Sequence, residues 1–215
     1  MKKTSIQLLL VTIVTVGAAC SARSTTYQTS PTAATDTVHF QSSAKLEFVE
    51  GLTNTIVGSL EVNPDSSVGN TKGIFRVDLR TMKTGIDLRD EHMRTRHLET
   101  DKYPYAFFEI SAISNAPTQL AIDSTYQLTA AGKFYIHGAW LSITVATTVR
   151  RTRFADSEVL AVRANFAIKL DEFGIPRPKA LFLKLAETIN VEVIFTAANN
   201  LPSTEIVLPD WPEKK

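Results

Sequence analysis

The chain has 215 residues, of which 44% are hydrophobic and 21% are charged, so it can bury a core and is not expected to be disordered. Its 23 basic and 22 acidic residues leave a formal net charge of +1, which excludes the strongly basic surface that nucleic-acid binding requires. With a single cysteine, no disulfide can form within the chain.

Residues 1–19 have the pattern of a signal peptide. A positively charged start precedes the apolar run from Ile6 to Val16, which is too short to span a membrane. Small residues and Cys20 follow, as in the lipobox of bacterial lipoproteins, so Cys20 is the expected lipid attachment point. Because Ser21 stands where inner-membrane retention needs Asp, we expect an outer-membrane anchor facing the periplasm. The alternative is an ordinary secretory signal cleaved nearby.

The next residues, 20–36, are rich in Ser, Thr and Ala and have no apolar periodicity, so they are predicted to form a flexible tether. The folded domain is expected over residues 37–198. Residues 199–215 contain three prolines and are predicted to be a loosely held tail.

Between the tether and the tail, apolar residues alternate with polar or small ones in segment after segment. This alternation predicts about eight strands and an all-β fold, an antiparallel sandwich or barrel. The predicted strands are 38–40, 46–48, 56–62, 74–79, 105–110, 126–136, 141–149, 159–170 and 188–197, with a hairpin turn near His137-Gly138. One exception, Leu88 to Leu98, has the pattern of a short helix, with Asp87 or Asp90 as its N-cap.

Three segments carry distinctive motifs: Thr84-Gly85-Ile86-Asp87-Leu88-Arg89-Asp90-Glu91-His92-Met93-Arg94 with Tyr103-Pro104 and Phe107-Phe108-Glu109-Ile110, then Gly132-Lys133-Phe134-Tyr135-Ile136-His137-Gly138, then Ile168-Lys169-Leu170-Asp171-Glu172-Phe173-Gly174-Ile175. Together they resemble the YceI-like family of periplasmic polyisoprenoid-binding proteins, and the likeness extends over about residues 38–198. The resemblance implies an antiparallel lipocalin-like β-barrel whose interior is a tunnel for a polyprenyl chain or a similar long lipid.

An apolar tunnel needs no polar chemistry to bind a hydrocarbon chain. An eight-stranded barrel has room for one small ligand, and each CH₂ group that it buries contributes about 0.8 kcal/mol. The alternative is a barrel completely filled by the same side chains, which would act in envelope interactions. The candidate lining residues are Phe75, Phe107, Phe134, Ile136, Phe166 and Phe195.

Polar residues near the predicted helix and hairpin turn are candidates for the ligand head group. Cationic groups at a tunnel mouth could contact a phosphate or quinone. The alternatives are structural: helix starts carry such charges, and a turn histidine can hydrogen-bond its local backbone. The candidates are Arg89, Asp90, His92, Arg94 and His137.

Signatures of catalysis are weak. The chain has no Gly-x-Ser-x-Gly motif, and its cysteine lies at the processing site. His92 and His97 are five residues apart, a poor fit to one helical face, so no metal site is expected. We therefore expect a carrier without a cofactor. The alternative is an isomerase or lyase acting on an isoprenoid or quinone through His137 and a carboxylate. Expected partners are a hydrophobic ligand, the membrane through the lipid anchor, and a second copy through exposed edge strands.

Overall fold

The fold is taken from a computed structural model. The predicted signal peptide, Cys20 and most of the C-terminal tail lie outside the residues that it describes, and so do Leu46 and Glu47 of one predicted strand. The described residues are 24–30, 35–43, 48–65, 67–177, 179–180, 183–184 and 186–201.

Almost all of the regular structure is β-strand. Twelve of the sixteen elements in the described residues are strands, and the remaining four are short helical turns. The strands are β1 (Thr25–Thr29), β2 (Thr37–Ser43), β3 (Phe48–Thr53), β4 (Ile56–Asn63), β5 (Ser67–Asp78), β6 (Tyr105–Ser114), β7 (Thr125–Ile136), β8 (Ala139–Phe154), β9 (Ser157–Lys169), β10 (Lys179–Ala180), β11 (Leu183–Lys184) and β12 (Thr188–Ala198).

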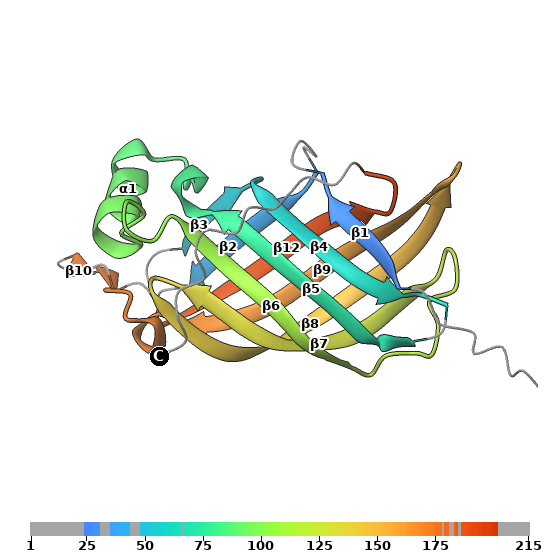
Figure 1. Ribbon diagram of the computed structural model, residues 1–215. Helices are drawn as coiled ribbons and strands as arrows, with labels where there is room; N and C mark the ends of the chain where they lie inside the picture. The colour runs from blue at the N-terminus through green and yellow to red at the C-terminus, as the bar shows by residue number, and fades with distance from the viewer. Residues whose placement is uncertain are drawn as a thin grey trace, which may run out of the picture.

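The main sheet closes on itself as an elongated antiparallel barrel (Figure 1). Its hydrogen-bonded order is β1-β4-β5-β6-β7-β8-β9-β12, and β12 pairs again with β1, which makes eight wall positions. A closed barrel leaves no unpaired edge. The expected all-β, lipocalin-like architecture is therefore confirmed.

At two of the eight positions around the barrel, two strands stand in the place of one, namely β1 with β2 and β3 with β4. On one edge of β12, β2 pairs with Asn190–Ile194 and β1 pairs with Ala197 and Ala198. At the break between β1 and β2, Asp36 Oδ1 accepts hydrogen bonds from the Thr196 backbone N–H (3.1 Å) and hydroxyl (3.3 Å). The next wall position is formed by β3 and β4. The buried carboxylate thus satisfies the backbone where the ladder is interrupted.

The predicted tether is wrong for residues 25–29, because these residues form β1. This strand pairs with β4 and β12, and Tyr27 is completely buried in the core. The sequence Thr-Thr-Tyr-Gln-Thr carries one large apolar residue, so it shows no hydrophobic alternation. Threonine and tyrosine nevertheless favour strands, and the pairing partners decide the outcome.

The expected hairpin turn between β7 and β8 is confirmed. His137 and Gly138 both have positive φ, +53° and +80°, as the two central residues of a tight hairpin turn require. A Cβ atom at position 138 would lie 2.9 Å from the Tyr103 ring, so this position needs glycine for space as well as for conformation.

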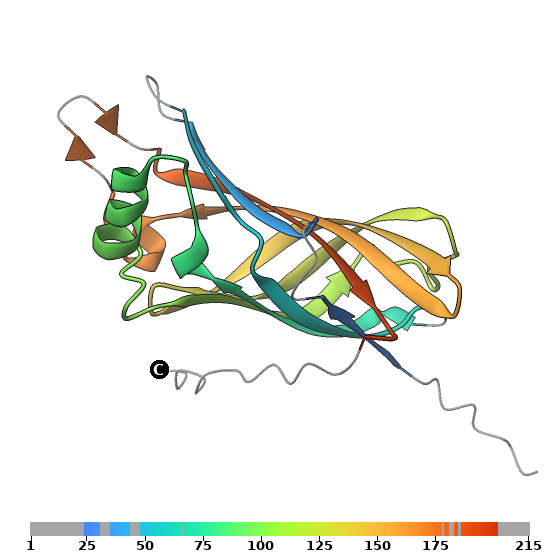
Figure 2. The same cartoon turned by 90° about the horizontal axis from the view of Figure 1, so that it is seen from above.

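The predicted helix is also present, at one end of the barrel. Figure 2 shows helix α1 (Asp87–His92) there, on the same side as β10 and β11. The chain continues through a wider π-helical turn, η2 (Met93–His97), closed by a hydrogen bond from Leu98 N to the Met93 carbonyl. Among the described residues, no helix is long and apolar enough to span a membrane.

The expected N-cap of this helix is wrong. Neither Asp87 nor Asp90 caps it, because the cap position is Ile86, which makes no side-chain cap bond. Asp90 is instead buried and accepts hydrogen bonds from the backbone N–H (2.7 Å) and hydroxyl of Thr84. Its carboxylate therefore holds the helix against Thr84 in the loop that precedes it.

Candidate ligand-binding site

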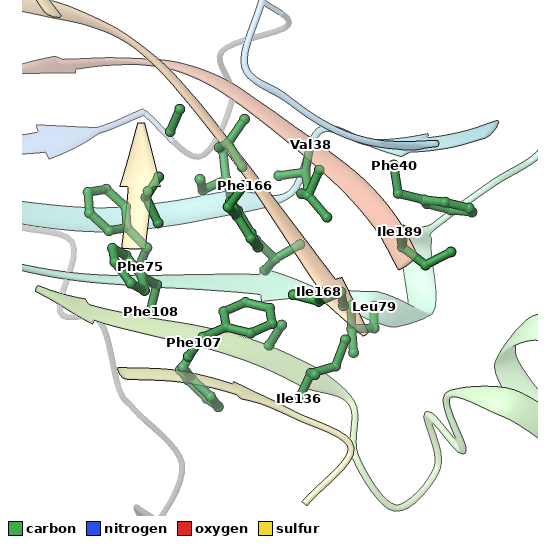
Figure 3. A pocket seen from close by; sticks show the side chains of 18 of the residues that line it. Val38, Phe40, Phe75, Leu79, Phe107, Phe108, Ile136, Phe166, Ile168 and Ile189 are labelled. Atoms are coloured by element: carbon green, nitrogen blue, oxygen red, sulfur yellow. The ribbon is translucent and has the colours of Figure 1, made fainter. Parts of the chain in front are cut away.

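The barrel encloses an apolar cavity of about 540 Å³ (Figure 3). Ligand pockets commonly start at about 300 Å³, so the alternative of a completely filled barrel is wrong. Every wall position contributes lining residues, because alternate side chains of each strand point inward. Representative ones are Val38, Leu60, Phe75, Phe108, Ala130, Phe134, Val149, Ala164, Phe166, Val191 and Phe195.

All six candidate lining residues border the cavity. Several of their rings contact each other across strands: the Phe75 and Phe195 centroids are 4.9 Å apart, and those of Phe134 and Phe166 are 5.3 Å apart. Such tilted pairs pack well without filling the barrel. The predicted inward face of β5, β7, β9 and β12 is the one that the structure shows.

In β6 a second lining aromatic residue, Phe108, was missed by sequence reasoning. Phe108 lies directly opposite Phe75 and Phe134, which line the cavity from the two neighbouring strands. Phe107 also borders the cavity, but its ring contacts those of Tyr105 and Tyr135. The alternation of Ala106, Phe108 and Ile110 was the signal that could have identified Phe108.

Helix α1 brings polar groups to one end of this apolar cavity. Arg89 and His92 from α1 and His97 from η2 are lining residues, and they are the titratable side chains in the described lining. The Arg89 guanidinium is held in place, because Nε donates to the Thr84 hydroxyl (2.8 Å) and Nη2 donates to the Thr84 carbonyl (2.9 Å). A cation held in a fixed position therefore borders the helix end of the cavity.

His97 closes the same end against the segment that follows η3 (Asp171–Phe173). Its Nδ1 lies 2.8 Å from the Pro176 carbonyl, which can only accept, so Nδ1 carries the proton. Burial lowers the pKa of His97 more than this hydrogen bond raises it. The imidazole is therefore neutral at pH 7 and leaves Nε2 as an acceptor.

The remaining polar candidates lie outside the lining. Arg94 Nη1 donates to the Met82 carbonyl (3.4 Å), and Asp90 is occupied by Thr84 as described above. These two residues therefore position the helix. They do not border the cavity in the part of the chain that the structure describes.

His137 also lies outside the lining and connects three segments. Nδ1 lies 3.2 Å from the Phe173 carbonyl and Nε2 lies 3.0 Å from Glu99 Oε2, and the ring makes a tilted contact with Tyr103 at a centroid distance of 4.9 Å. The sequence-based alternative of a histidine–carboxylate pair is thus present as a contact. Neither His137 nor Glu99 is among the described residues that line the cavity, so the pair is placed to hold the β7–β8 turn.

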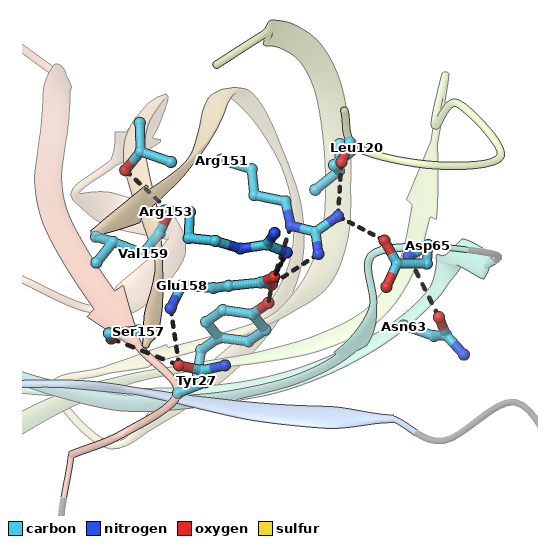
Figure 4. Close-up of polar contacts among 11 residues, drawn as sticks. Tyr27, Asn63, Asp65, Leu120, Arg151, Arg153, Ser157, Glu158 and Val159 are labelled. Atoms are coloured by element: carbon cyan, nitrogen blue, oxygen red, sulfur yellow. Dashed lines mark hydrogen bonds and ion pairs between the residues drawn. The ribbon is translucent and has the colours of Figure 1, made fainter. Parts of the chain in front are cut away.

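The opposite end of the barrel is closed by a buried ionic network (Figure 4). Arg151, only 4% exposed, donates to Asp65 (2.7 Å), to the carbonyl of the lining residue Leu120 (2.8 Å) and to Glu158 Oε2 (2.7 Å). The Tyr27 hydroxyl donates to the same Glu158 oxygen (2.9 Å). Sequence reasoning gave no sign of this network, whose members are up to 131 residues apart.

The network keeps Glu158 ionised. Burial alone would raise its pKa, but hydrogen bonds from Arg153, Arg151 and Tyr27 outweigh burial and lower the pKa to about 2. Burial and the hydrogen bond to Glu158 together raise the pKa of Tyr27. A charged pair that is removed from water is costly unless its hydrogen bonds are complete, and here they are supplied from β1, β8 and β9. This end therefore acts as the closed end.

A closed antiparallel barrel around an apolar cavity, with polar groups at one end, defines the class of lipocalin-like binding barrels. The YceI-like domain model matches residues 27–197, from β1 to β12. The chain therefore belongs to the YceI-like family. A comparison with curated proteins returned no match.

Solved structures with the same fold share little sequence with the chain. BcnA of Burkholderia cenocepacia aligns with a TM-score of 0.59 and 16% identity over 75% of this chain and 95% of its own. A polyisoprenoid binding domain from Saccharophagus degradans, implicated in plant cell wall breakdown, aligns with 0.61 and 17% over 81% and 98%. The YCEI protein of Campylobacter jejuni aligns with 0.62 and 16% over 74% and 90%. These similarities establish the fold.

Proposed function

We propose that the chain is an exported carrier that holds one long apolar chain in its barrel and releases it chemically unchanged. The observation that carries this proposal is the 540 Å³ cavity, whose lining is apolar from the closed end to the helix. Burying a hydrocarbon chain there is favourable without any directed contact. In the described lining, the titratable side chains lie at the helix end, so the buried hydrocarbon chain contacts no group that could react with it.

The ligand class that best fits is a polyisoprenoid or a similar long lipid. The similarity to a polyisoprenoid binding domain supports this class. We assign the head-group contact to Arg89 and His92, because both border the helix end of the cavity. Asp90 and Arg94 would act through the position of α1, and His137 through the β7–β8 turn. No further cofactor is part of this proposal.

The start of the sequence supports an exported, periplasmic protein anchored in the outer membrane through an acyl group on Cys20. Metabolic labelling with a radioactive fatty acid tests the anchor. The label should be found on the parent protein and be lost from Cys20→Ser. If the parent is not labelled, the protein is secreted without an acyl anchor, and the proposed role of the barrel is unaffected.

The decisive test compares two tryptophan variants on the same strand. Ala164 lines the cavity, whereas Ala161 is exposed on the outer face of β9. Ala164→Trp places a large ring across the tunnel, and Ala161→Trp places the same ring in solvent. Each protein is exported as residues 21–215 behind an ordinary secretory signal, so that it lacks Cys20 and the acyl anchor. It is purified from a periplasmic extract without detergent, and its lipids are extracted and identified by mass spectrometry.

We expect the parent and Ala161→Trp to carry about one apolar molecule per barrel, and Ala164→Trp to lose most of it. The thermal unfolding of all three proteins is measured as a check on folding. Equal lipid content in Ala164→Trp and Ala161→Trp, or repeated preparations of the parent without any lipid, would overturn the carrier proposal.

A further inference from the structure

Exposed hydrophobic side chains are concentrated at the helix end of the barrel. Among the described residues, five large hydrophobic side chains are at least half exposed. Four of them, Phe48, Leu52, Ile86 and Leu88, come from β3 and from the start of α1, at that end (Figure 1). The fifth, Phe154, is at the tip of the β8–β9 hairpin at the other end. We call the group of four the apolar rim.

The rim is continuous with the cavity. Ile86 and Leu88 are 54% and 62% exposed, yet both also line the cavity. Leu52 pairs with Lys83, three residues before Ile86, through two backbone hydrogen bonds of 2.9 and 3.0 Å. Phe48 lies on the same exposed face of β3 as Leu52. An apolar surface therefore extends from the interior of the barrel onto its outside.

The charges beside the rim are balanced. The cations at or beside the rim are Lys83, the partly exposed Arg89 and Arg96, and the anions are Asp87, Glu91 and Glu50, which lies between Phe48 and Leu52 on the exposed face of β3. A partner that is recognised by charge, such as an acidic or basic protein surface, finds no excess of either sign here. The apolar side chains are left as the recognition element. Exposed apolar groups ringed by mixed charges suit the boundary between head groups and acyl chains of a bilayer.

We propose that the apolar rim docks on a lipid bilayer, so that the ligand passes between membrane and cavity without crossing water. This inference rests on the proposed carrier function and adds the surface and partner through which it operates. During docking, Ile86 and Leu88 insert among the lipid head groups, and the tunnel opens toward the acyl chains. The closed end, with Arg151 and Phe154, points away from that bilayer.

Vesicle flotation tests docking independently of any ligand. All barrel strands of the described residues lie after position 24, so the assay uses residues 21–215, which lack Cys20. The probe is a vesicle of phosphatidylethanolamine and phosphatidylglycerol. Leu88→Asp is compared with Phe154→Asp, a matched loss of an even more exposed side chain, 81% against 62%. Aspartate in the first turn of a helix is compatible with its dipole, so Leu88→Asp should fold.

We expect Leu88→Asp to weaken vesicle association at least about tenfold, since one buried leucine accounts for that factor. Phe154→Asp should float as the parent does. Uptake of a fluorescent prenol from the same vesicles should accelerate with vesicle concentration in the parent and in Phe154→Asp, and should be slow in Leu88→Asp. Phe48→Asp, at a rim residue that is not among the described lining residues, should also slow uptake from vesicles, whereas its uptake from detergent solution should equal that of the parent and of Phe154→Asp.

Equal flotation of Leu88→Asp and Phe154→Asp, or an uptake rate independent of vesicle concentration, would refute docking while leaving the carrier function in place. A parent that floats but takes up no prenol from vesicles or detergent would retain docking and refute the ligand class. If Leu88→Asp instead converts a dimeric parent into a monomer in sedimentation and changes nothing on vesicles, the rim is an interface between copies, and the lipid proposal is wrong.

Discussion

The cavity sets a length for the chain that it can enclose. Val68 and Val77, nine residues apart on β5, both line it. At a rise of about 3.3 Å per residue and a strand tilt of about 40°, this stretch covers roughly 23 Å of the barrel axis. An extended hydrocarbon with bonds of about 1.52 Å advances about 1.25 Å per carbon, so about 18 carbons fit.

The cavity volume leads to the same number. If a CH₂ group fills about the 30 Å³ that a water molecule occupies in the liquid, 540 Å³ holds about 18 of them. Affinity should therefore rise by about 0.8 kcal/mol, or roughly fourfold, for each added carbon, and level off near 18 carbons. Further carbons would extend beyond the mouth and add little.

Competition by saturated fatty alcohols of about 10 to 26 carbons against a fluorescent apolar probe measures this dependence. We expect a break near 18 carbons in the parent and at a shorter chain in Ala164→Trp, because the added ring shortens the tunnel. An uninterrupted rise up to the longest alcohol, or an affinity that does not depend on length, would refute the reasoning.

Three further predictions concern the supports of the barrel. Glu158 has a lowered pKa in the folded state, so its contribution to the free energy of unfolding, on the order of 3 kcal/mol, is complete above pH 4.5 and is lost as the pH falls toward 2. Urea titrations should show this loss in the parent, and an equal loss in Glu158→Gln would contradict it. Gly132→Ala should cost about 3 kcal/mol of unfolding free energy, since its Cβ would lie 2.2 Å from the Glu109 carbonyl oxygen. The control Gly69→Ala, whose Cβ would lie 3.9 Å from the nearest atom, should cost less than about 1 kcal/mol. Equal costs would refute the steric account. His137→Ala should lower the melting temperature but retain bound lipid in mass spectrometry, and loss of lipid at an unchanged melting temperature would instead place this histidine at the ligand.

Much of the barrel could be predicted because each long strand carries its own signal. In β9, Val162, Phe166 and Ile168 alternate with exposed residues, so one face had to be buried. β1 could not be found in this way, because only Tyr27 in it is large and apolar, and its place depends on pairing with β4 and β12. The residues of one segment do not by themselves show which distant strand it will pair with.

The site was predictable only in part, for the same reason. The faces of β5, β7, β9 and β12 followed from alternation, but two consecutive phenylalanines in β6 left the choice between Phe107 and Phe108 to the register with neighbouring strands. Asp90 was assigned to the helix start on residue type alone, while its partner Thr84 comes from the preceding loop. The Arg151 network unites groups from several strands, which a single sequence does not reveal.

The central claim is that the barrel interior is an apolar tunnel occupied by a single long chain. A crystal structure of residues 21–215, exported without Cys20 and purified from the periplasm without detergent, tests it most directly. The account predicts one continuous tube of non-protein density that runs past Phe75, Phe108 and Phe166 toward Leu88. Ordered, hydrogen-bonded water molecules along that path, or side chains that close it, would contradict the account.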